Sequence, residues 1–455
     1  MMKTFMRSYR KTYKKCISGC VILCLGSVLS SCSDLVGGAR LPDSILDPGA
    51  VHTEAGAMGS YQNTLLRFAN AMSENGQTPN MVFSAGLMSD ELTVRLYSER
   101  FATYDLDIID SRAPTTKDGA LGVFSNLHKV RGAAQEARGF LRNFAPKTSP
   151  ALLGHLFAVE GMADLMLAEL FCSGMPLSTV DFDGDYTVTP GFSTADVYHV
   201  ALGLLDSADV YVGDSVRLKT LVQLVRGRAL IGLGQFDAAK AAVQSVETSF
   251  RYTIPYTNKW VPKTTGGSVS DVLIASGEGG TGLPFGTLQD PRTTLPELTN
   301  PAASLVIATG IEARLIEAEA ALSAGQGEWL RILNQLRTTC PDIQTCPTPA
   351  PLGSGGIGGL PPLTDPAPGM NYSDPIAKKA RVRLLFEERA YWLFLTGRRQ
   401  GDLRRLVRWY GYPQETIYPS GRWGLGRYGD RVGLSVPQSE RELNPLYKGC
   451  QNYDA

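Results

Sequence analysis

Helical spacing of apolar residues is the feature that most limits how this chain can fold. Four segments share the spacing: residues 57–73, 119–144, 152–171 and 194–212. In the second of them, Leu121, Phe124 and Leu127 recur every three or four positions, so they line one face of a helix. Ser193 or Thr194 can supply the N-cap of the last segment. The chain is therefore predicted to be mostly α-helical.

Further along, the helical segments come in pairs. Two pairs are expected, at residues 218–233 with 236–249 and at residues 303–324 with 328–339. Gly234 breaks the first pair, and the small residues of segment 227–242 resemble a tetratricopeptide unit, in which two antiparallel helices approach closely. The full period of about 34 residues is absent. The pairs are therefore expected to form a degenerate array with long insertions.

Two stretches rich in Gly and Pro interrupt the helices, at residues 253–300 and 341–374. The first contains short β-prone runs such as residues 272–275. Helices are expected again at 375–396 and 400–410. The predicted fold is mostly α, with tetratricopeptide-like helix pairs packed with a loop-rich insert region that contains a few short strands. One more strand is expected near residues 432–436.

The first 31 residues have the order of a secretory signal, with a basic front, an apolar run and small residues. The apolar run is too short for a membrane span of about 20 residues. Residues 29–32, which end in Cys32, resemble a bacterial lipobox. The resemblance implies cleavage before Cys32, a lipid on its thiol, and a tether over residues 32–48. The alternatives are an ordinary signal peptide and an uncleaved anchor.

Charge excludes a nucleic-acid-binding surface. The leader carries 6 of the 44 basic residues and no acid, so the mature chain keeps 44 − 6 = 38 bases against 44 acids, a net charge of −6. A nucleic-acid-binding surface needs clustered excess Lys and Arg. No second long apolar run follows the leader, so the body is expected to be soluble and tethered.

Four of the 8 cysteines remain after the leader and the lipidated Cys32 are set aside. In an exported chain an even number favours disulfides, and four cysteines allow three connectivities. Cys340 and Cys346 are close in sequence and are expected to pair, which leaves Cys172 with Cys450. Zinc is the alternative, but no histidine lies near these cysteines in sequence.

Motifs for catalysis are weak. Residues 277–282 match G-x-G-x-x-G, but Pro284 and a further loop follow where a dinucleotide site needs a helix, so a flexible loop is expected. The 4 histidines show no metal-binding spacing, and no metal or cofactor is expected. Adjacent carboxylates at 387 and 388 point to different helix faces, which argues against a glycosidase pair.

Charged side chains near the C-terminus are instead interpreted as structural. A buried ion-pair network that ties two helices is expected from Glu388, Arg389, Arg398 and Asp402. The basic run that contains Arg404 and Arg405 is interpreted as a solvated or paired helix face.

Five blocks in order resemble the SusD/RagB family of outer-membrane nutrient-binding lipoproteins. They are residues 121–141, 160–177, 314–337, 385–405 and 436–445. The fourth is the sharpest, since it resembles E-R-x-x-E-L-x-x-E-G-x-R-x-x-D-L-x-R, although Tyr391 and Thr396 replace acids of that pattern. The resemblance implies a single domain over residues 49–455, with four tetratricopeptide-like pairs and a loop-rich face.

The same resemblance implies a function. Such proteins are lipid-anchored at the outer membrane beside a SusC-like, TonB-dependent transporter, and they capture nutrient oligomers, often glycans, for import without catalysis. Family contacts often lie in the region that corresponds to residues 90–104, which gives Tyr97, Arg100 and Tyr104 as candidate ligand contacts. Tyr256 and Trp260 are further candidates, because sugars stack on exposed aromatic faces.

Two other classes of function remain open at this point. One is an envelope lipoprotein that uses its tetratricopeptide-like helices as a protein-docking scaffold. An open concave groove of helices would favour it, whereas an aromatic, pocketed loop face would favour nutrient capture. The other is a surface glycoside hydrolase, which would need two opposed carboxylates in a cleft.

Overall fold

Helices form most of the structure, as the apolar spacing predicts. In the computed structural model the described residues are 52–74, 80–94, 109, 112, 121–148, 150–181, 184–256, 259–261, 272–286, 290–294, 301, 304–339, 360–420, 429 and 431–454. Residues 54–455 form one compact unit. The expected signal peptide, the tether and Cys32 lie outside the described residues.

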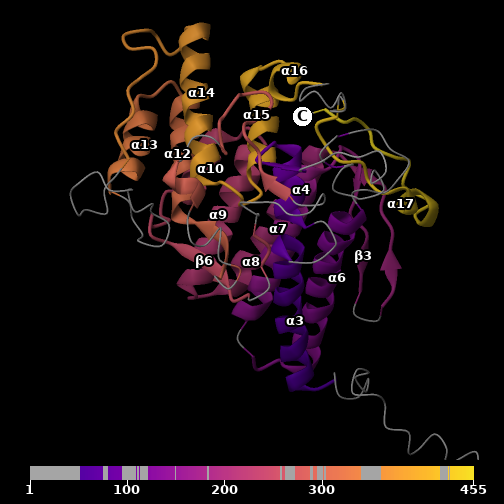
Figure 1. The fold of residues 1–455 in the computed structure, drawn as a ribbon. Coiled ribbons are helices and arrows are strands. Elements are labelled where there is room, and N and C mark those ends of the chain that lie inside the picture. The colour runs from indigo at the N-terminus through magenta and orange to yellow at the C-terminus, as the bar shows by residue number, and fades with distance from the viewer. Residues whose placement is uncertain are drawn as a thin grey trace, which may run out of the picture. The chain divides into compact units, whose positions relative to one another are not determined.

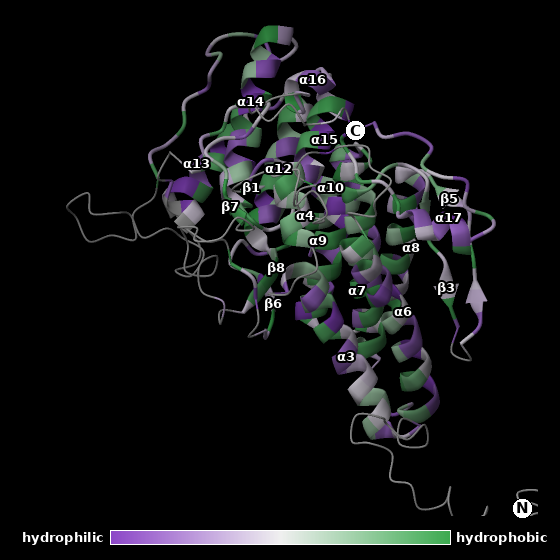
Figure 2. Ribbon diagram, turned by 45° about the vertical axis from the view of Figure 1, so that its right-hand side comes forward, coloured by the Kyte–Doolittle hydropathy of each residue, from purple (hydrophilic) through white to green (hydrophobic). Residues whose placement is uncertain are grey.

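In the first group of helices, three helices pack around α7. It consists of α3 (Glu54–Ser73), α6 (Leu121–Phe144), α7 (Ala151–Leu170) and α8 (Thr194–Val212). Helices α3, α6 and α7 run side by side (Figure 1), and hydrophilic and hydrophobic residues are interspersed along α3 and α6 (Figure 2). Ser193 caps α8 with a reciprocal capping box to Asp196.

Helix α7 is apolar and buried. It is the one helix in the described part of the chain that is long and apolar enough to cross a membrane. However, every residue from Ala158 to Leu170 is buried within the protein. Gly154 permits the close approach to α8, because a Cβ there would lie 2.7 Å from the Val212 side chain. The apolar surface of α7 is therefore used for packing in the core.

Two helix pairs follow, as the tetratricopeptide-like pattern predicts. The first is α9 (Val216–Gly232) with α10 (Phe236–Val243), and the second is α12 (Gly310–Ser323) with α13 (Glu328–Thr339). Gly234 and Gly325 make the turns, both with a φ of 71°, a conformation that glycine adopts without a steric penalty. Helix α10 ends at Val243, several residues before the predicted end at 249.

The strands are short and form two-stranded ribbons. They are β1 (Leu92–Val94) with β7 (Val272–Ile274), β2 (Met175–Pro176) with β5 (Gly191–Phe192), β3 (Thr179–Val180) with β4 (Tyr186–Thr187), and β6 (Arg251–Ile254) with β8 (Leu305–Thr309), all antiparallel. The last strand corrects the helix expected over 303–324. Its β-branched run pairs with β6, and the Thr309 hydroxyl then caps α12 by accepting the Glu312 N–H.

The C-terminal helices pack onto the helix pairs. They are α14 (Pro375–Trp392) and α15 (Arg399–Tyr410), followed by the short α16 (Gln414–Ile417) and α17 (Gln438–Leu443). Instead of the strand expected near 432–436, Leu434 makes a single bridge to Phe171. Two further elements were not predicted: α4 (Met81–Met88), which is buried along its whole length, and the 3₁₀ turn η1 (Pro291–Thr294).

Candidate functional site

The ribbon of β1 and β7 is where two candidate ligand-binding segments join the scaffold. Val94, the last residue of β1, is paired with Val272, the first residue of β7. The segment with Tyr97, Arg100 and Tyr104 follows directly after β1, and these three residues lie outside the described part of the chain. The segment that begins after Val94 and the segment that ends before Val272 therefore join the ribbon at the same end.

Tyr256 lies in the core. Its side chain is 8% exposed, and its hydroxyl donates a hydrogen bond to the Asn70 Oδ1 at 2.7 Å. A ring buried in this way anchors the loop to α3 and offers no face to a ligand. The burial therefore corrects the expectation of an exposed aromatic here.

Trp260 is only partly buried. Its ring packs on Phe83 of α4, with centroids 3.8 Å apart, and its backbone N–H donates to the Ser73 carbonyl at 2.8 Å. The indole is thus held in position by two helices while part of its surface stays accessible. Of the two described aromatic candidates, Trp260 is the one that remains.

The glycine-rich loop behind the ribbon is structural. Glu278, only 1% exposed, accepts two hydrogen bonds from the Arg399 guanidinium at 2.6 Å each. A Cβ on Gly280 would collide with the Ile417 carbonyl, so this glycine permits a close backbone approach. No helix begins at the motif. The loop is therefore neither a dinucleotide site nor the flexible loop expected from its composition.

Glu91, at the start of β1, is fully buried beside this loop. One oxygen accepts the Leu395 N–H at 3.2 Å, and the other has no hydrogen-bond partner in the described part of the chain. Burial raises the pKa of Glu91 to about 8, against the attraction of Arg399. Near neutral pH this carboxyl therefore stays protonated.

An ion-pair cluster ties α12, α14 and α15 together. Arg389 donates to both oxygens of Asp402 at 2.9 and 2.8 Å, and Arg405 does the same to Glu319 at 3.0 and 2.9 Å. Burial alone would raise the pKa of Asp402, but Arg389 and Arg405 outweigh it and hold that pKa at about 2. Arg389 and Asp402 thus make the contact between α14 and α15 that the expected network needs.

Glu388 and Arg398 have other partners than expected. Glu388 accepts from Arg292 at 2.9 Å and from Arg337 at 2.6 Å, so its partners differ from that of Arg389, the next residue of α14. Arg398 lies 3.8 Å from both Glu169 and Glu312. The four residues named from the sequence therefore belong to more than one cluster, because successive residues on a helix face different neighbours.

Arg404 holds the C-terminal end of α7. Its Nη1 donates to the carbonyls of Ala168, Glu169 and Phe171 at 2.8 to 3.0 Å. The last carbonyls of a helix have no partner within the helix, so this buried guanidinium supplies one. Of the two interpretations of the basic run, a solvated or a paired helix face, the contacts of Arg404 and Arg405 agree with the paired face.

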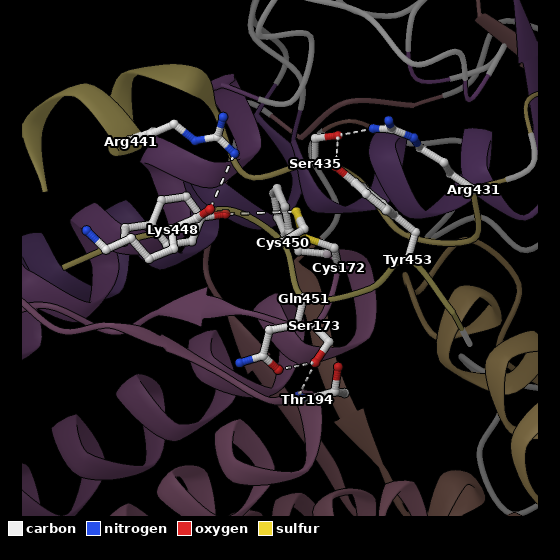
Figure 3. Close-up of a disulfide and its surroundings, with 12 residues drawn as sticks. Cys172, Ser173, Thr194, Arg431, Ser435, Arg441, Lys448, Cys450, Gln451 and Tyr453 are labelled. Carbon is white, nitrogen blue, oxygen red and sulfur yellow. Dashed lines mark hydrogen bonds between the residues drawn. A yellow bond between two sulfur atoms is a disulfide. The ribbon is translucent and has the colours of Figure 1, made fainter. Parts of the chain in front are cut away.

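A disulfide joins the end of α7 to the C-terminal segment (Figure 3). Cys172 and Cys450 are bonded, and the neighbouring Ser173 exchanges backbone hydrogen bonds with Gln451 and Asn452. Further along the same segment, the Tyr453 hydroxyl lies 3.2 Å from the Ser435 hydroxyl. Cys340 and Cys346 lie outside the described residues.

The described residues show no group of side chains arranged for catalysis. The buried acids Glu278, Glu312, Glu319 and Asp402 each bind an arginine. No group of three His, Cys, Asp or Glu side chains is placed there to hold a metal ion. His155 lies between two tyrosine hydroxyls, and burial lowers the pKa of His155 to about 4.

Comparison with known proteins settles the fold. No family model matches the sequence, and no curated protein matches it. A SusD-like protein from Bacteroides fragilis superposes with a TM-score of 0.59 at 14% identity, over 91% of this chain and 100% of that one. The chain has the SusD fold. A SusD superfamily protein from Bacteroides vulgatus gives a TM-score of 0.57 at 14% identity, over 88% and 98%.

A third structure with the SusD fold is described as surface glycan-binding protein A from Bacteroides uniformis. It matches with a TM-score of 0.57 at 12% identity, over 86% of this chain and 99% of that one. The sharpest sequence block, residues 385–405, contains Arg389, Asp402 and Arg405 of the ion-pair cluster. At the departure from the pattern, Tyr391 is buried and places its ring 4.9 Å from the Arg292 guanidinium.

Proposed function

We propose that this protein is a surface-exposed outer-membrane lipoprotein that binds a nutrient oligomer, a glycan, and passes it to a SusC-like, TonB-dependent transporter. The observation that carries the proposal is the SusD fold over nearly the full length of proteins described as carbohydrate-binding or glycan-binding. The lipobox-like leader supports the anchor. The proposed organisation is a signal peptide over 1–31, a tether over 32–48 and one domain over 49–455.

The packing of the helix pairs favours capture of a small ligand over protein docking. A docking scaffold needs an open concave groove of helices. Here the end of α15 contacts the first pair: the Trp409 indole donates to the Gly232 carbonyl at 3.2 Å, and Tyr410 packs its ring near Phe236. The second pair is likewise bound to α15 through Glu319 and Arg405.

Binding is tested with the mature chain against a panel of neutral and acidic oligosaccharides by isothermal titration calorimetry. At least one glycan is expected to bind, and Trp260→Ala is expected to weaken it because the indole has an accessible face held in place by α4. Tyr186→Ala is the matched control, since Tyr186 is 79% exposed on β4. Absence of binding across the panel contradicts the proposed function. Equal loss in both variants contradicts only the placement at Trp260.

The anchor and the partner are tested separately in cells. Labelled palmitate is expected to enter the wild-type protein and not a Cys32→Ser variant, and protease added to intact cells is expected to digest the wild-type chain. A tagged protein extracted with mild detergent is expected to retain a TonB-dependent barrel. A chain that is labelled and exposed but retains no barrel contradicts the delivery step alone.

A further inference from the structure

A groove of about 490 Å³ lies among α6, α7, α8 and the hairpin that starts at β3. Its volume is in the range of small-molecule sites. None of its lining residues is among those that hold Tyr256 or Trp260. The groove is therefore distinct from the loop contacts considered above and does not rest on the proposed function.

One wall is a polar stripe on α6. Arg131, Gln135, Arg138 and Arg142 follow each other at helical spacing and line the groove together. The first two are already engaged. Arg131 binds Asp164 at 2.5 Å, and Gln135 accepts the N–H of Val180 at 3.0 Å while it donates to Glu160 at 2.5 Å. These bonds fix α6 against the hairpin and against α7.

The other two arginines differ in their partners. Arg138 is 9% exposed, and its Nη1 lies 2.6 Å from Glu160 but has no acceptor with hydrogen-bond geometry in the described part of the chain. Arg142 is exposed and has no carboxylate partner among the described residues. Both guanidiniums lie over the Phe157 ring, with centroid distances of 4.1 and 6.0 Å.

The charge balance of this wall favours an anion. Arg138 and Arg142 are four residues apart on one helix face, where like charges repel. Glu160 offsets Arg138. The whole lining contains three arginines and two acids, Glu160 and Asp181, so its net charge is 3 − 2 = +1. A carboxylate placed between the two would remove the repulsion and could bind a guanidinium through two parallel hydrogen bonds.

The remaining lining is mostly apolar. Its apolar members come from the hairpin region and from α8, and they are Leu177, Val180, Phe192, Val200 and Leu204. The hairpin also adds two polar residues, Thr179 and Asp181. The C–H face of a sugar ring can pack on such a surface while hydroxyls reach the polar stripe. A few convergent polar groups beside an apolar wall are the usual composition of a small-ligand site.

We infer that this groove binds a carboxylate-bearing sugar, a hexuronic acid, with its carboxylate at Arg138 and Arg142 and its ring against Phe192 and Val200. The carboxylate provides the selectivity, because a neutral hexose leaves Arg142 without an anion. A neutral ligand in the same groove would make only the apolar contacts.

Ligand-observed NMR titration of the mature chain tests the inference, with D-glucuronate and D-glucose as the probes. Glucuronate is expected to bind at least about tenfold more tightly than glucose, and Arg142→Gln is expected to weaken glucuronate by about tenfold. Because Arg142 is exposed, this variant should fold normally. Lys129→Gln, which removes one exposed positive charge elsewhere on α6, is the matched control and should leave the affinity unchanged.

A groove-filling variant, Val200→Trp, is expected to abolish glucuronate binding while the helical circular dichroism spectrum stays that of the wild type. Equal affinity for the two sugars, or unchanged affinity in Arg142→Gln, would overturn the inference. Retained binding in a folded Val200→Trp protein would do so as well. Failure of the groove and failure of the proposed function are distinguishable through the neutral oligosaccharides of the panel, which carry no carboxylate for this groove.

Discussion

Glu91→Gln is the substitution whose effect the structure defines most closely. Burial raises the pKa of Glu91 from 4.5 to about 8, so the folded protein keeps a proton that the unfolded chain releases near pH 4.5. The folded state therefore loses stability as the pH rises from about 4.5 to about 8. A shift of about 3.5 units corresponds to about 5 kcal/mol in total, at about 1.4 kcal/mol per unit.

Glutamine is a close mimic of the protonated carboxyl, since its oxygen can still accept the Leu395 N–H. The assay is urea unfolding of the wild type and the variant at pH 5, 6, 7 and 8. The difference between them isolates Glu91 from other groups, including His155, whose lowered pKa makes stability change in the opposite direction below pH 6.5.

Relative to the variant, the wild type is expected to lose about 4 kcal/mol between pH 5 and pH 8. A difference that stays constant to within about 0.5 kcal/mol over this range would refute the reasoning, because it would mean that Glu91 carries the same charge in the folded and unfolded states and that folding does not raise its pKa.

Three further outcomes are expected. Glu278→Gln should destabilise the protein by about 3–5 kcal/mol in urea unfolding, because it leaves Arg399 buried without its carboxylate. As a control, Glu387→Gln removes the exposed Arg383–Glu387 pair and should cost less than about 1 kcal/mol. Replacing Cys172 and Cys450 together by Ser should lower stability by about 2–5 kcal/mol, seen as a lower melting temperature, and an unchanged value would argue against a constraint by the bond. Gly280→Ala should destabilise by about 1–3 kcal/mol, since the added Cβ meets the Ile417 carbonyl; a wild-type melting curve would contradict that close approach.

Local patterns predicted much of the helical scaffold. The bounds of α8 and α13 match the sequence analysis, since Ser193 is a strong cap and α13 has one clear apolar face. Helix α4 was missed because it is buried on all sides, so its apolar residues show no period. The start of α12 was misplaced because an apolar β-strand and a buried helix look alike over a few residues.

The partners of buried charges could not be predicted. Glu278 and Arg399 are 121 residues apart, and nothing in the local sequence links them. The block that contains Glu388 and Arg389 indicated buried ion pairs, but it could not show that the first would face Arg292 and the second Asp402. Likewise the groove depends on α6, α7, α8 and a hairpin that meet only in three dimensions.

The arrangement around Arg399 shows how the ribbon of β1 and β7 is joined to the helical scaffold. Arg399 begins α15, the helix that binds α12 through Glu319 and Arg405 and the end of α7 through Arg404. The same guanidinium pairs with Glu278, which lies after β7, whereas the protonated Glu91, which lies just before β1, accepts the Leu395 N–H.

Both strands of the loop-bearing ribbon are thus fixed to the helical scaffold through buried carboxyl groups, Glu278 at Arg399 and Glu91 at the Leu395 N–H. Because a buried charge without its partner is costly, the ribbon has one favourable position on the scaffold. The segments that leave its far end can then change in sequence and length without disturbing that position, which is what a binding protein needs if its ligand specificity is to be set by loops.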